Sequence, residues 1–262
     1  MKGCVFGLVK GYPHYNGYFK LIKRNSLLKE NLLNQYPLDV IIFHEGNIKI
    51  EHQNRMIQEM NYPIKFININ PTYFSTPQNV TDYNLIGYKN MCRFNSIFIY
   101  EVLKDYTHAL RMDDDSFIES EIDFDIFKEM LDNNVVYVGA KKHVDPHGPT
   151  IDTLPSFVLK YLEDNQIQPK CGFDNINTEN FYNNLYATDL NFWRQNNVQH
   201  FLKSIDESFG IYTHRWGDST IQALAVKIFA GYENIRTFGS FKYRHDSHSW
   251  NNTMSGEKFN LV

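Results

Sequence analysis

The sequence has few cysteines, no excess of basic charge and no long apolar run, and each absence excludes a class of protein. The three cysteines lie far apart and form no Cys-x-x-Cys pair of the kind that binds zinc. Their odd number argues against a disulfide framework, and a reducing compartment is the simplest interpretation. With 26 basic and 30 acidic residues, the chain lacks the basic face that binds nucleic acid. No stretch reaches the ~18 apolar residues of a membrane span, and Met1–Lys10 is too interrupted for a signal peptide, so a soluble protein is expected.

Hydrophobic residues make up 42% of the 262 residues, which is enough for a substantial core. Apolar runs alternate with helical patterns at the start of the chain. Strands are expected at 4–9, 40–43 and 64–69, and helices at 16–34 and 51–60. This alternation predicts an α/β fold with a mostly parallel sheet and right-handed crossovers. No repeat or flexible linker interrupts the sequence, so residues 1–262 are expected to form a single domain.

The later elements follow from the same kind of pattern. A loop is expected at 70–86, and helices at 88–103, 124–131 (which Asp123 could cap), 197–208 and up to about 229 (which Asp218 could cap). A strand is expected at 135–138 and a strand or buried turn at 185–193. The region 141–180 is expected to be largely irregular, with a possible helix at 157–163, and could be a substrate loop; the tail at 241–250 looks loop-like.

Three consecutive carboxylates, Asp113, Asp114 and Asp115, follow a short apolar run. Adjacent like charges repel, so packing alone would not select them, whereas Mg²⁺ or Mn²⁺ prefers oxygen ligands. In an extended chain Asp113 and Asp115 point to the same side. An Asp-x-Asp at a strand end is typical of sugar-nucleotide transferases that bind a metal against a diphosphate. The alternative is a solvated acidic turn.

Other polar residues have both a structural and a functional interpretation. Asp218 could cap a helix or belong to an ordered site with Arg215-Trp-Gly before it. Lys10 and Tyr12 follow the first strand, where α/β folds bind nucleotides. Arg93 could contact a phosphate or a buried carboxylate.

Several blocks together resemble one family, the fungal α-1,2-mannosyltransferases of glycosyltransferase family 15. The resemblance covers about residues 84–248 and is weaker but collinear over 3–70. The blocks are Tyr88-Lys-Asn-Met-Cys-Arg-Phe-Asn-Ser96, Leu110-Arg-Met-Asp-Asp-Asp115, Leu190-Asn-Phe-Trp-Arg194, Arg215-Trp-Gly-Asp218 with Ala223-Leu-Ala225, and Tyr243-Arg-His245.

The resemblance implies a single-domain GT-A fold, with a nucleotide-binding half at about 1–140 and an acceptor-side half at about 141–262. It implies a retaining transfer that depends on Mn²⁺ (or Mg²⁺), with GDP-mannose as donor and a glycan or glycoprotein hydroxyl as acceptor. Lys10, Tyr12, Arg93, Asp113 and Asp115 are the expected contacts to the nucleotide sugar.

The family's Glu-Pro-Asp metal motif falls on residues 113–115, so Asp113 replaces the Glu and Asp114 stands at the proline. A second family ligand, the final His of Tyr-His-His, falls on His245, with Arg244 in place of the preceding His. The resemblance therefore implies a metal site of Asp113, Asp115 and His245, for which Asp246 and His248 are competing ligands.

The main departure concerns the family's proposed nucleophile or oxocarbenium stabiliser, a Glu that falls on Tyr186. A phenol, with a pKa near ~10, is a poor replacement. Asp189 could serve instead, and Asp218 is a further candidate for the acceptor hydroxyl. Alternatively, the reaction is a front-face displacement with the diphosphate as base.

Other functions stay open at this point. Tyr186 motivates a sugar-nucleotide or glycan-binding protein with lost or altered catalysis, and the donor could be a different nucleotide sugar. A phosphohydrolase is disfavoured because Phe117 lies where its Asp-x-Asp chemistry needs a small hydroxyl residue.

The expected location also departs from the family. Family members are Golgi type II membrane proteins with a lumenal catalytic domain, whereas this chain begins at the first strand. As written, it is expected to be cytoplasmic or virion-associated. Its bias to Asn, Lys, Ile and Tyr hints at an AT-rich genome, such as that of a protist or a large virus.

Overall fold

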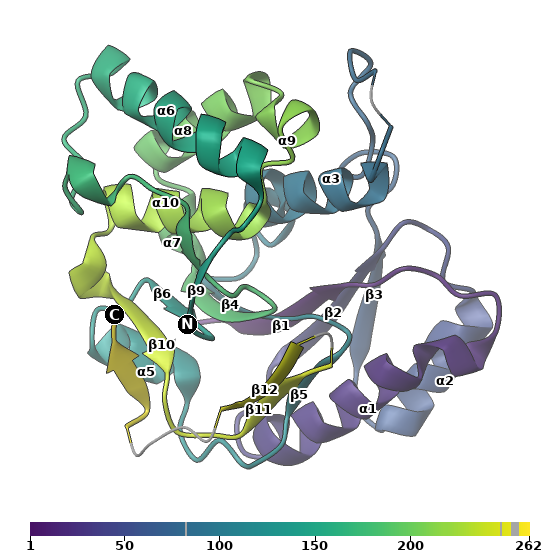
Figure 1. Ribbon diagram of the computed structural model, residues 1–262. Coiled ribbons are helices and arrows are strands. Elements are labelled where there is room, and N and C mark those ends of the chain that lie inside the picture. Colours follow the sequence, from purple (N-terminus) through teal and green to yellow (C-terminus); the bar gives the residue numbers. More distant parts are fainter. Residues whose placement is uncertain (82, 247, 253–256) are drawn as a thin grey trace.

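A mixed β-sheet runs through the middle of the molecule (Figure 1). The structure is a computed structural model that describes residues 1–81, 83–246, 248–252 and 257–262, with the backbone alone for 248–252. Within these ranges the sheet has eight strands. In order across the sheet they are β13 (Phe259–Leu261), β10 (Ile235–Phe238), β6 (Tyr137–Gly139), β9 (Leu185–Asp189), β4 (His108–Met112), β1 (Gly3–Leu8), β2 (Asp39–His44) and β3 (Ile64–Asn68).

Strand direction decides where the polar loops meet. β1, β2, β3 and β4 are parallel, β9 lies antiparallel between β4 and β6, and β10 is parallel to β6. The carboxyl ends of β1, β2 and β4 therefore lie at one edge of the sheet. Lys10, Glu45 and Asp113 follow these three strands, which is where open α/β sheets bind ligands.

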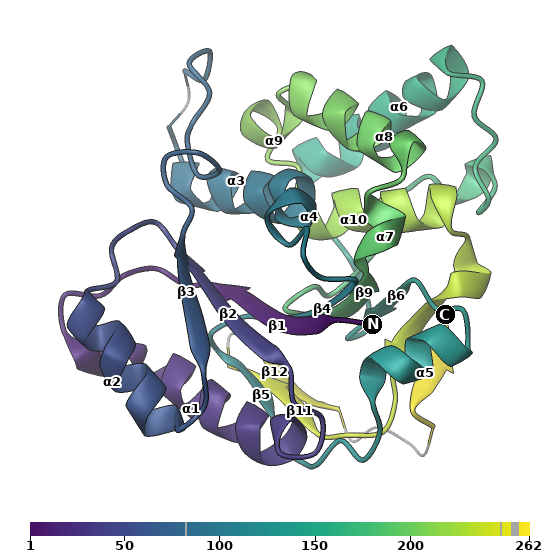
Figure 2. The same ribbon diagram turned by 180° about the vertical axis from the view of Figure 1, so that it is seen from behind.

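Helices cover both faces of the sheet (Figures 1 and 2). On one face lie α1 (Phe19–Leu28), which a 3-10 turn (Tyr15–Tyr18) precedes and a π-helical turn (Lys29–Leu33) follows, α2 (Ile50–Met60) and α5 (Ile126–Asp132). On the other lie α3 (Ile86–Arg93), a π-helical turn (Phe94–Phe98), α4 (Ile99–Val102), α6 (Gly148–Asp164), α7 (Leu190–Trp193), α8 (Asn196–Glu207), α9 (Gly210–Thr213) and α10 (Asp218–Phe229). None of the helices in the described ranges is long and apolar enough to cross a bilayer.

Alternation along the strands divides the hydrophobic core in two. Cys4 and Phe6 of β1 belong to the core beneath α10, whereas Val5 belongs to the core beneath α1. The central strands are continuous apolar runs in the sequence, because both of their faces are covered. Each fully buried aliphatic or aromatic side chain stabilises the fold by about 1.5–3 kcal/mol.

Two small sheets lie beside the main one. β5 (Ser116–Ile118) pairs with β11 (Tyr243–His245), which pairs in turn with β12 (His248–Asn252). β7 (Lys142–Val144) pairs with β8 (Glu179–Phe181). The antiparallel register places His245 opposite Ser116, so a residue near the chain's end lies beside the acidic turn.

The first three strands, the two helices between them and the helical stretch after Tyr88 are confirmed. The α5 cap is Asp125 and not Asp123, since Oδ1 of Asp125 accepts from the N–H groups of Phe127 and Lys128 at 3.0 Å. Asp218 is also not a cap: Gly217 takes that position and Asp218 begins the helix.

Two regions are more regular than expected. The possible helix at 157–163 is confirmed but is longer, since α6 has 17 residues and begins at Gly148, before Pro149 and Pro155. A proline in the first turn is compatible with a helix, because its missing N–H would have no intrahelical partner there. The tail contains β11 and β12, which pair with each other, and β11 also pairs with the distant β5.

Candidate active site

The three carboxylates form a turn between β4 and β5. The N–H of Asp113 donates to the carbonyl of Asn184 at 3.0 Å, and the N–H of Ser116 donates back to the carbonyl of Asp113 at 3.2 Å. Ser116 Oγ also donates to the Asn184 carbonyl at 2.9 Å. These bonds fix the turn to the chain that leads into β9. Burial raises the pKa of both Asp113 and Asp114, so a nearby positive charge would stabilise their ionised forms.

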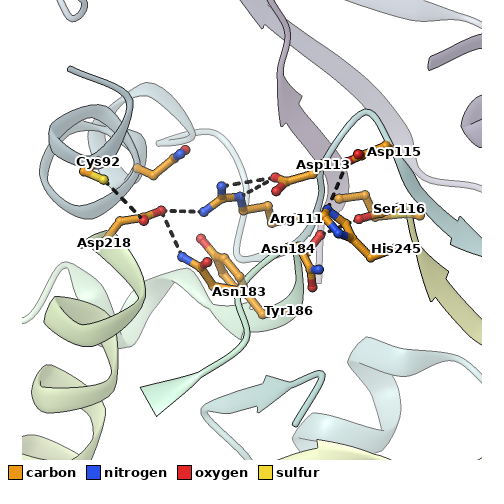
Figure 3. A network of polar contacts seen from close by, with 12 residues as sticks. Cys92, Arg111, Asp113, Asp115, Ser116, Asn183, Asn184, Tyr186, Asp218 and His245 are labelled. Carbon is orange, nitrogen blue, oxygen red and sulfur yellow. Dashed lines mark hydrogen bonds and ion pairs between the residues drawn. The ribbon is translucent and has the colours of Figure 1, made fainter. Parts of the chain in front are cut away.

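Arg111 connects Asp113 to Asp218 (Figure 3). Its Nε lies 3.1 Å from Asp113 Oδ1, and its Nη1 lies 2.6 Å from Asp218 Oδ2. The side chains of Arg111 and Asp218 are each only 6% exposed. Burial alone would lower the pKa of Arg111, but the charges of Asp113 and Asp218 raise it well above its ordinary value. Asp218 also accepts from Asn183 Nδ2 at 2.9 Å.

Asp115 contacts an imidazole and an ammonium group. Nε2 of His245 lies 2.9 Å from Asp115 Oδ1, and Nζ of Lys20 lies 3.4 Å from Asp115 Oδ2. Lys20 also lies 3.6 Å from Asp246 Oδ2. Strand pairing of β11 with β5 therefore brings His245 and Asp246 to the acidic turn.

Two pockets flank this turn. The polar pocket has a volume of about 520 Å³ and the strand-end pocket about 480 Å³. The polar pocket is lined by Tyr88, Met91, Arg111, Asp113, Lys141, His143, Asp145, Pro146, Asn180, Tyr182, Asn183, Asn184, Arg215, Asp218, Ser219 and His245. The strand-end pocket is lined by Leu8, Lys10, Tyr12, Gly17, Phe19, Lys20, Glu45, Phe74, Gly87, Met91, Asp114 and Asp115. The acidic turn thus separates two cavities that share Met91.

The oxygen and imidazole groups of the turn have the chemistry of a Mn²⁺ or Mg²⁺ site. In the described part of the chain, no three His, Cys, Asp or Glu side chains already surround one point. Asp113 faces Arg111, whereas Asp115 faces His245. The donor set still fits a divalent cation, because partial burial raises the pKa of the Asp113 and Asp114 carboxyl groups, so added positive charge would stabilise their ionised forms. The side chain of His248, a competing ligand in the sequence, lies outside the described residues.

Tyr186 does not face either pocket. It is fully buried, its ring stacks on that of Tyr137 with centroids 5.1 Å apart, and Gln222 Nε2 donates to its hydroxyl at 3.2 Å. Burial raises the pKa of Tyr186 to about 12. A neutral phenol held in the core cannot serve as a carboxylate does.

Asp189 and Arg93 also lie away from the acidic turn. β9 runs antiparallel to β4, so Asp189 pairs with His108 at the opposite end of the strand from Asp113. Its Oδ1 accepts from the N–H of Asn191 at 2.8 Å, which makes it the N-cap of α7. Arg93 binds both carboxylate oxygens of Asp206 at 2.6 and 2.8 Å.

Sequence reasoning missed Arg111, Lys20 and Tyr88. Arg111 lies two residues before Asp113, so strand alternation puts both on the same side, and this signal was available. Tyr88 lines the polar pocket, and the Arg215 guanidinium lies 4.8 Å from its ring centroid. Nothing local in the sequence of α1 indicates that Lys20 faces the turn.

The chain is similar in sequence to known proteins. The model of the glycolipid 2-alpha-mannosyltransferase family matches residues 59–254. A glycolipid 2-alpha-mannosyltransferase of Saccharomyces cerevisiae is 26% identical over 93% of the chain and 60% of its own length. Glycolipid 2-alpha-mannosyltransferase 1 of Candida albicans is 31% identical over 61% of the chain and 39% of its own length. The chain thus spans about two fifths to three fifths of these relatives.

Solved structures share the fold. The Mn/GDP form of core-mannan synthase A from Aspergillus fumigatus superimposes with a TM-score of 0.85 at 19% identity, over 100% of this chain and 78% of that chain. The mannosyltransferase Ktr4p of S. cerevisiae in complex with GDP gives 0.84 at 20% identity, over 99% and 75%. The expected GT-A fold is confirmed. By the family match over residues 59–254, the chain belongs to the glycolipid 2-alpha-mannosyltransferase family.

Proposed function

We propose that the protein is a metal-dependent retaining mannosyltransferase that moves mannose from GDP-mannose to a hydroxyl of a glycan or protein. The observation that carries this proposal is the acidic turn, which has His245 beside Asp115 and a pocket on each side. Family membership and the fold shared with a Mn/GDP-bound synthase support it.

Asp113, Asp115 and His245 would hold the metal. A Mn²⁺ or Mg²⁺ ion held by these residues would neutralise the diphosphate and make it a better leaving group. Lys10 and Tyr12 of the strand-end pocket would bind the nucleotide, since they lie beyond the carboxyl end of β1. Arg93, which binds Asp206, is left with a structural role in this proposal.

The donor mannose and the acceptor would occupy the polar pocket. Asp218, Asn183 and the hydroxyl of Tyr88 present polar groups there. Among the described residues, neither amide atom of Asn184 has a hydrogen-bond partner, which is costly for buried groups. A sugar hydroxyl in the pocket would supply that partner.

The burial of Tyr186 favours front-face displacement over a covalent intermediate at that position. In this reaction the acceptor oxygen bonds to the anomeric carbon from the side that the diphosphate leaves. The bond from that carbon to the phosphate oxygen breaks, and the departing phosphate takes the acceptor's proton. Asp218 and Tyr88 would position the acceptor and stabilise the charge that develops on the sugar.

The first test compares the melting temperature of the protein with Mn²⁺ and GDP and with Mn²⁺ and UDP. We expect GDP to raise the melting temperature when Mn²⁺ is present, because a ligand that binds only the folded state stabilises it. The second test measures the release of GDP from GDP-mannose with mannoside acceptors. No increase with either nucleotide would contradict the proposal, and an increase with UDP alone would indicate a different donor.

A second candidate is a sugar-nucleotide-binding protein without turnover, which the buried Tyr186 favours. It predicts the same Mn²⁺-dependent increase with GDP but no release of GDP with any acceptor.

A further inference from the structure

Helix α1 presents two cations to the acidic turn, one turn of helix apart. Arg24 is fully buried, and its Nη2 donates to the Met112 carbonyl at 2.9 Å. Lys20 lies nearer solvent, with its side chain 34% exposed, and its Nζ lies between Asp115 and Asp246 at 3.4 and 3.6 Å. Arg24 is therefore fixed, whereas Lys20 is free to change partners.

We propose, on the basis of the proposed function, that Lys20 exchanges partners when substrate binds. Without ligand it neutralises Asp115 and so competes with the metal. With metal and nucleotide bound, it turns to the diphosphate in the strand-end pocket and becomes a nucleotide-binding residue.

The contacts of Lys20 are suited to such an exchange. Both are longer than a tight ion pair and partly exposed, and pairs of this kind contribute only about 0–1 kcal/mol to stability. The ammonium group is a compact charge on a flexible stem. Lys20 lines the strand-end pocket together with Asp115, so a diphosphate beside that carboxylate lies within its reach.

Neither carboxylate is left without a partner when Lys20 leaves. Asp115, whose Oδ1 lies 2.9 Å from Nε2 of His245, would then be a ligand of the metal. Asp246 keeps Arg244, which also binds Glu119 at 2.7 Å. Of the remaining charges in the pocket, Lys10 would reinforce diphosphate binding, and Asp114 and Glu45 would oppose it. The departure of Lys20 therefore leaves no bare carboxylate behind.

The proposal predicts opposite effects on two ligands. In Lys20→Met, loss of a cation next to Asp115 should tighten binding of Mn²⁺ alone, by about threefold. The same substitution should weaken GDP at saturating Mn²⁺ by about tenfold, the loss expected for one charge-assisted contact. A purely structural role would weaken both ligands or neither.

The control is Lys23→Met on the same helix, which changes the net charge equally. Lys23 is outside the residues that line the strand-end pocket, and its Nζ lies 5.2 Å from the Phe117 ring centroid. Titration calorimetry of each variant with Mn²⁺, and then with GDP at saturating Mn²⁺, measures both affinities. We expect Lys23→Met to match wild type and Lys20→Arg to restore most of the GDP affinity.

Three outcomes would overturn the inference. Both affinities could fall together in Lys20→Met, or the variant could behave like Lys23→Met while wild type binds GDP. In either case the proposed function would stand. A wild-type protein that binds no GDP with Mn²⁺ would overturn the proposed function and this inference with it.

Discussion

On each side of the acidic turn a cation lies between two carboxylates, and the two sites differ mainly in burial. Arg111 lies between Asp113 and Asp218 with its side chain 6% exposed, at 3.1 and 2.6 Å. Lys20 lies between Asp115 and Asp246 with its side chain 34% exposed, at 3.4 and 3.6 Å.

The difference separates structural from ligand-binding cations. A buried charge loses its hydration and cannot leave its partners without a large penalty, so Arg111 holds the two carboxylates in place. An exposed ammonium group exchanges protein oxygens for water or phosphate at little cost. The same arrangement of charges thus holds side chains in place beside the polar pocket, whereas beside the strand-end pocket it leaves a cation that can change partners.

Replacing Arg111 should reduce the stability of the fold much more than replacing Lys20. Arg111→Met leaves the buried Asp218 and the partly exposed Asp113 without their shared cation, and we expect a loss of about 3–5 kcal/mol in the free energy of unfolding. Lys20→Met is the matched variant and should stay within about 1 kcal/mol of wild type. Urea denaturation followed by circular dichroism measures both, and equal losses would contradict the distinction.

Asp218→Asn tests whether the buried site also acts in turnover. The amide keeps the shape of the side chain but removes its charge from the polar pocket, so we expect kcat to fall about 100-fold, within the range of positioned catalytic groups. The affinity for GDP with Mn²⁺ should not change, because Asp218 does not line the strand-end pocket.

Asp145→Asn is the control for this substitution. Asp145 lines the same pocket and accepts from the N–H of His147 at 3.0 Å, a contact that an amide oxygen can also make. A loss of rate as large as that of Asp218→Asn would count against a specific role for Asp218.

Lys227 extends the comparison to a buried cation that has no carboxylate partner among the described residues. Its Nζ donates to the carbonyls of Asn175 and Glu179 at 3.1 Å and to Asn177 Oδ1 at 3.2 Å. Burial lowers its pKa to about 8, whereas the carboxylates around Arg111 raise the pKa of that group.

The stability of the protein should therefore rise with pH relative to Lys227→Met. Between about pH 8 and the ordinary lysine value near ~10.4, the unfolded chain keeps a proton that the folded protein has lost, so unfolding takes up a proton. Urea denaturation at pH 7.5 and 9.5 compares the two. The exposed Lys203 provides the control. The difference in the free energy of unfolding between Lys203→Met and wild type should be the same at both pH values.

Asp189→Ala should have the smallest effect, because this carboxylate lies outside both cation sites. Loss of the α7 cap should reduce the free energy of unfolding by about 1 kcal/mol and leave kcat unchanged. Asp189→Asn, which also caps well, should match wild type in both. A large loss of rate in either variant would return Asp189 to the list of catalytic candidates.

Much of the fold could be predicted from local patterns. The first strands are apolar runs of strand length, and α2 and α8 have helical periodicity, so their type followed from the sequence. The region around α6 could not be predicted as well, because Pro149 and Pro155 suggest loops unless their place in a helix is known. β11 was missed because its stability comes from pairing with β5, more than 120 positions earlier.

The sequence by itself determined the acidic turn, the strands that precede it and the family blocks, because these depend on residue type and short spacing. Only the tertiary structure decided that Asp218 faces Arg111, 107 positions away, that His245 contacts Asp115, and that Tyr186 lies in the core. Strand register and helix packing set these relations, and a partner chosen by packing leaves no local pattern in the sequence.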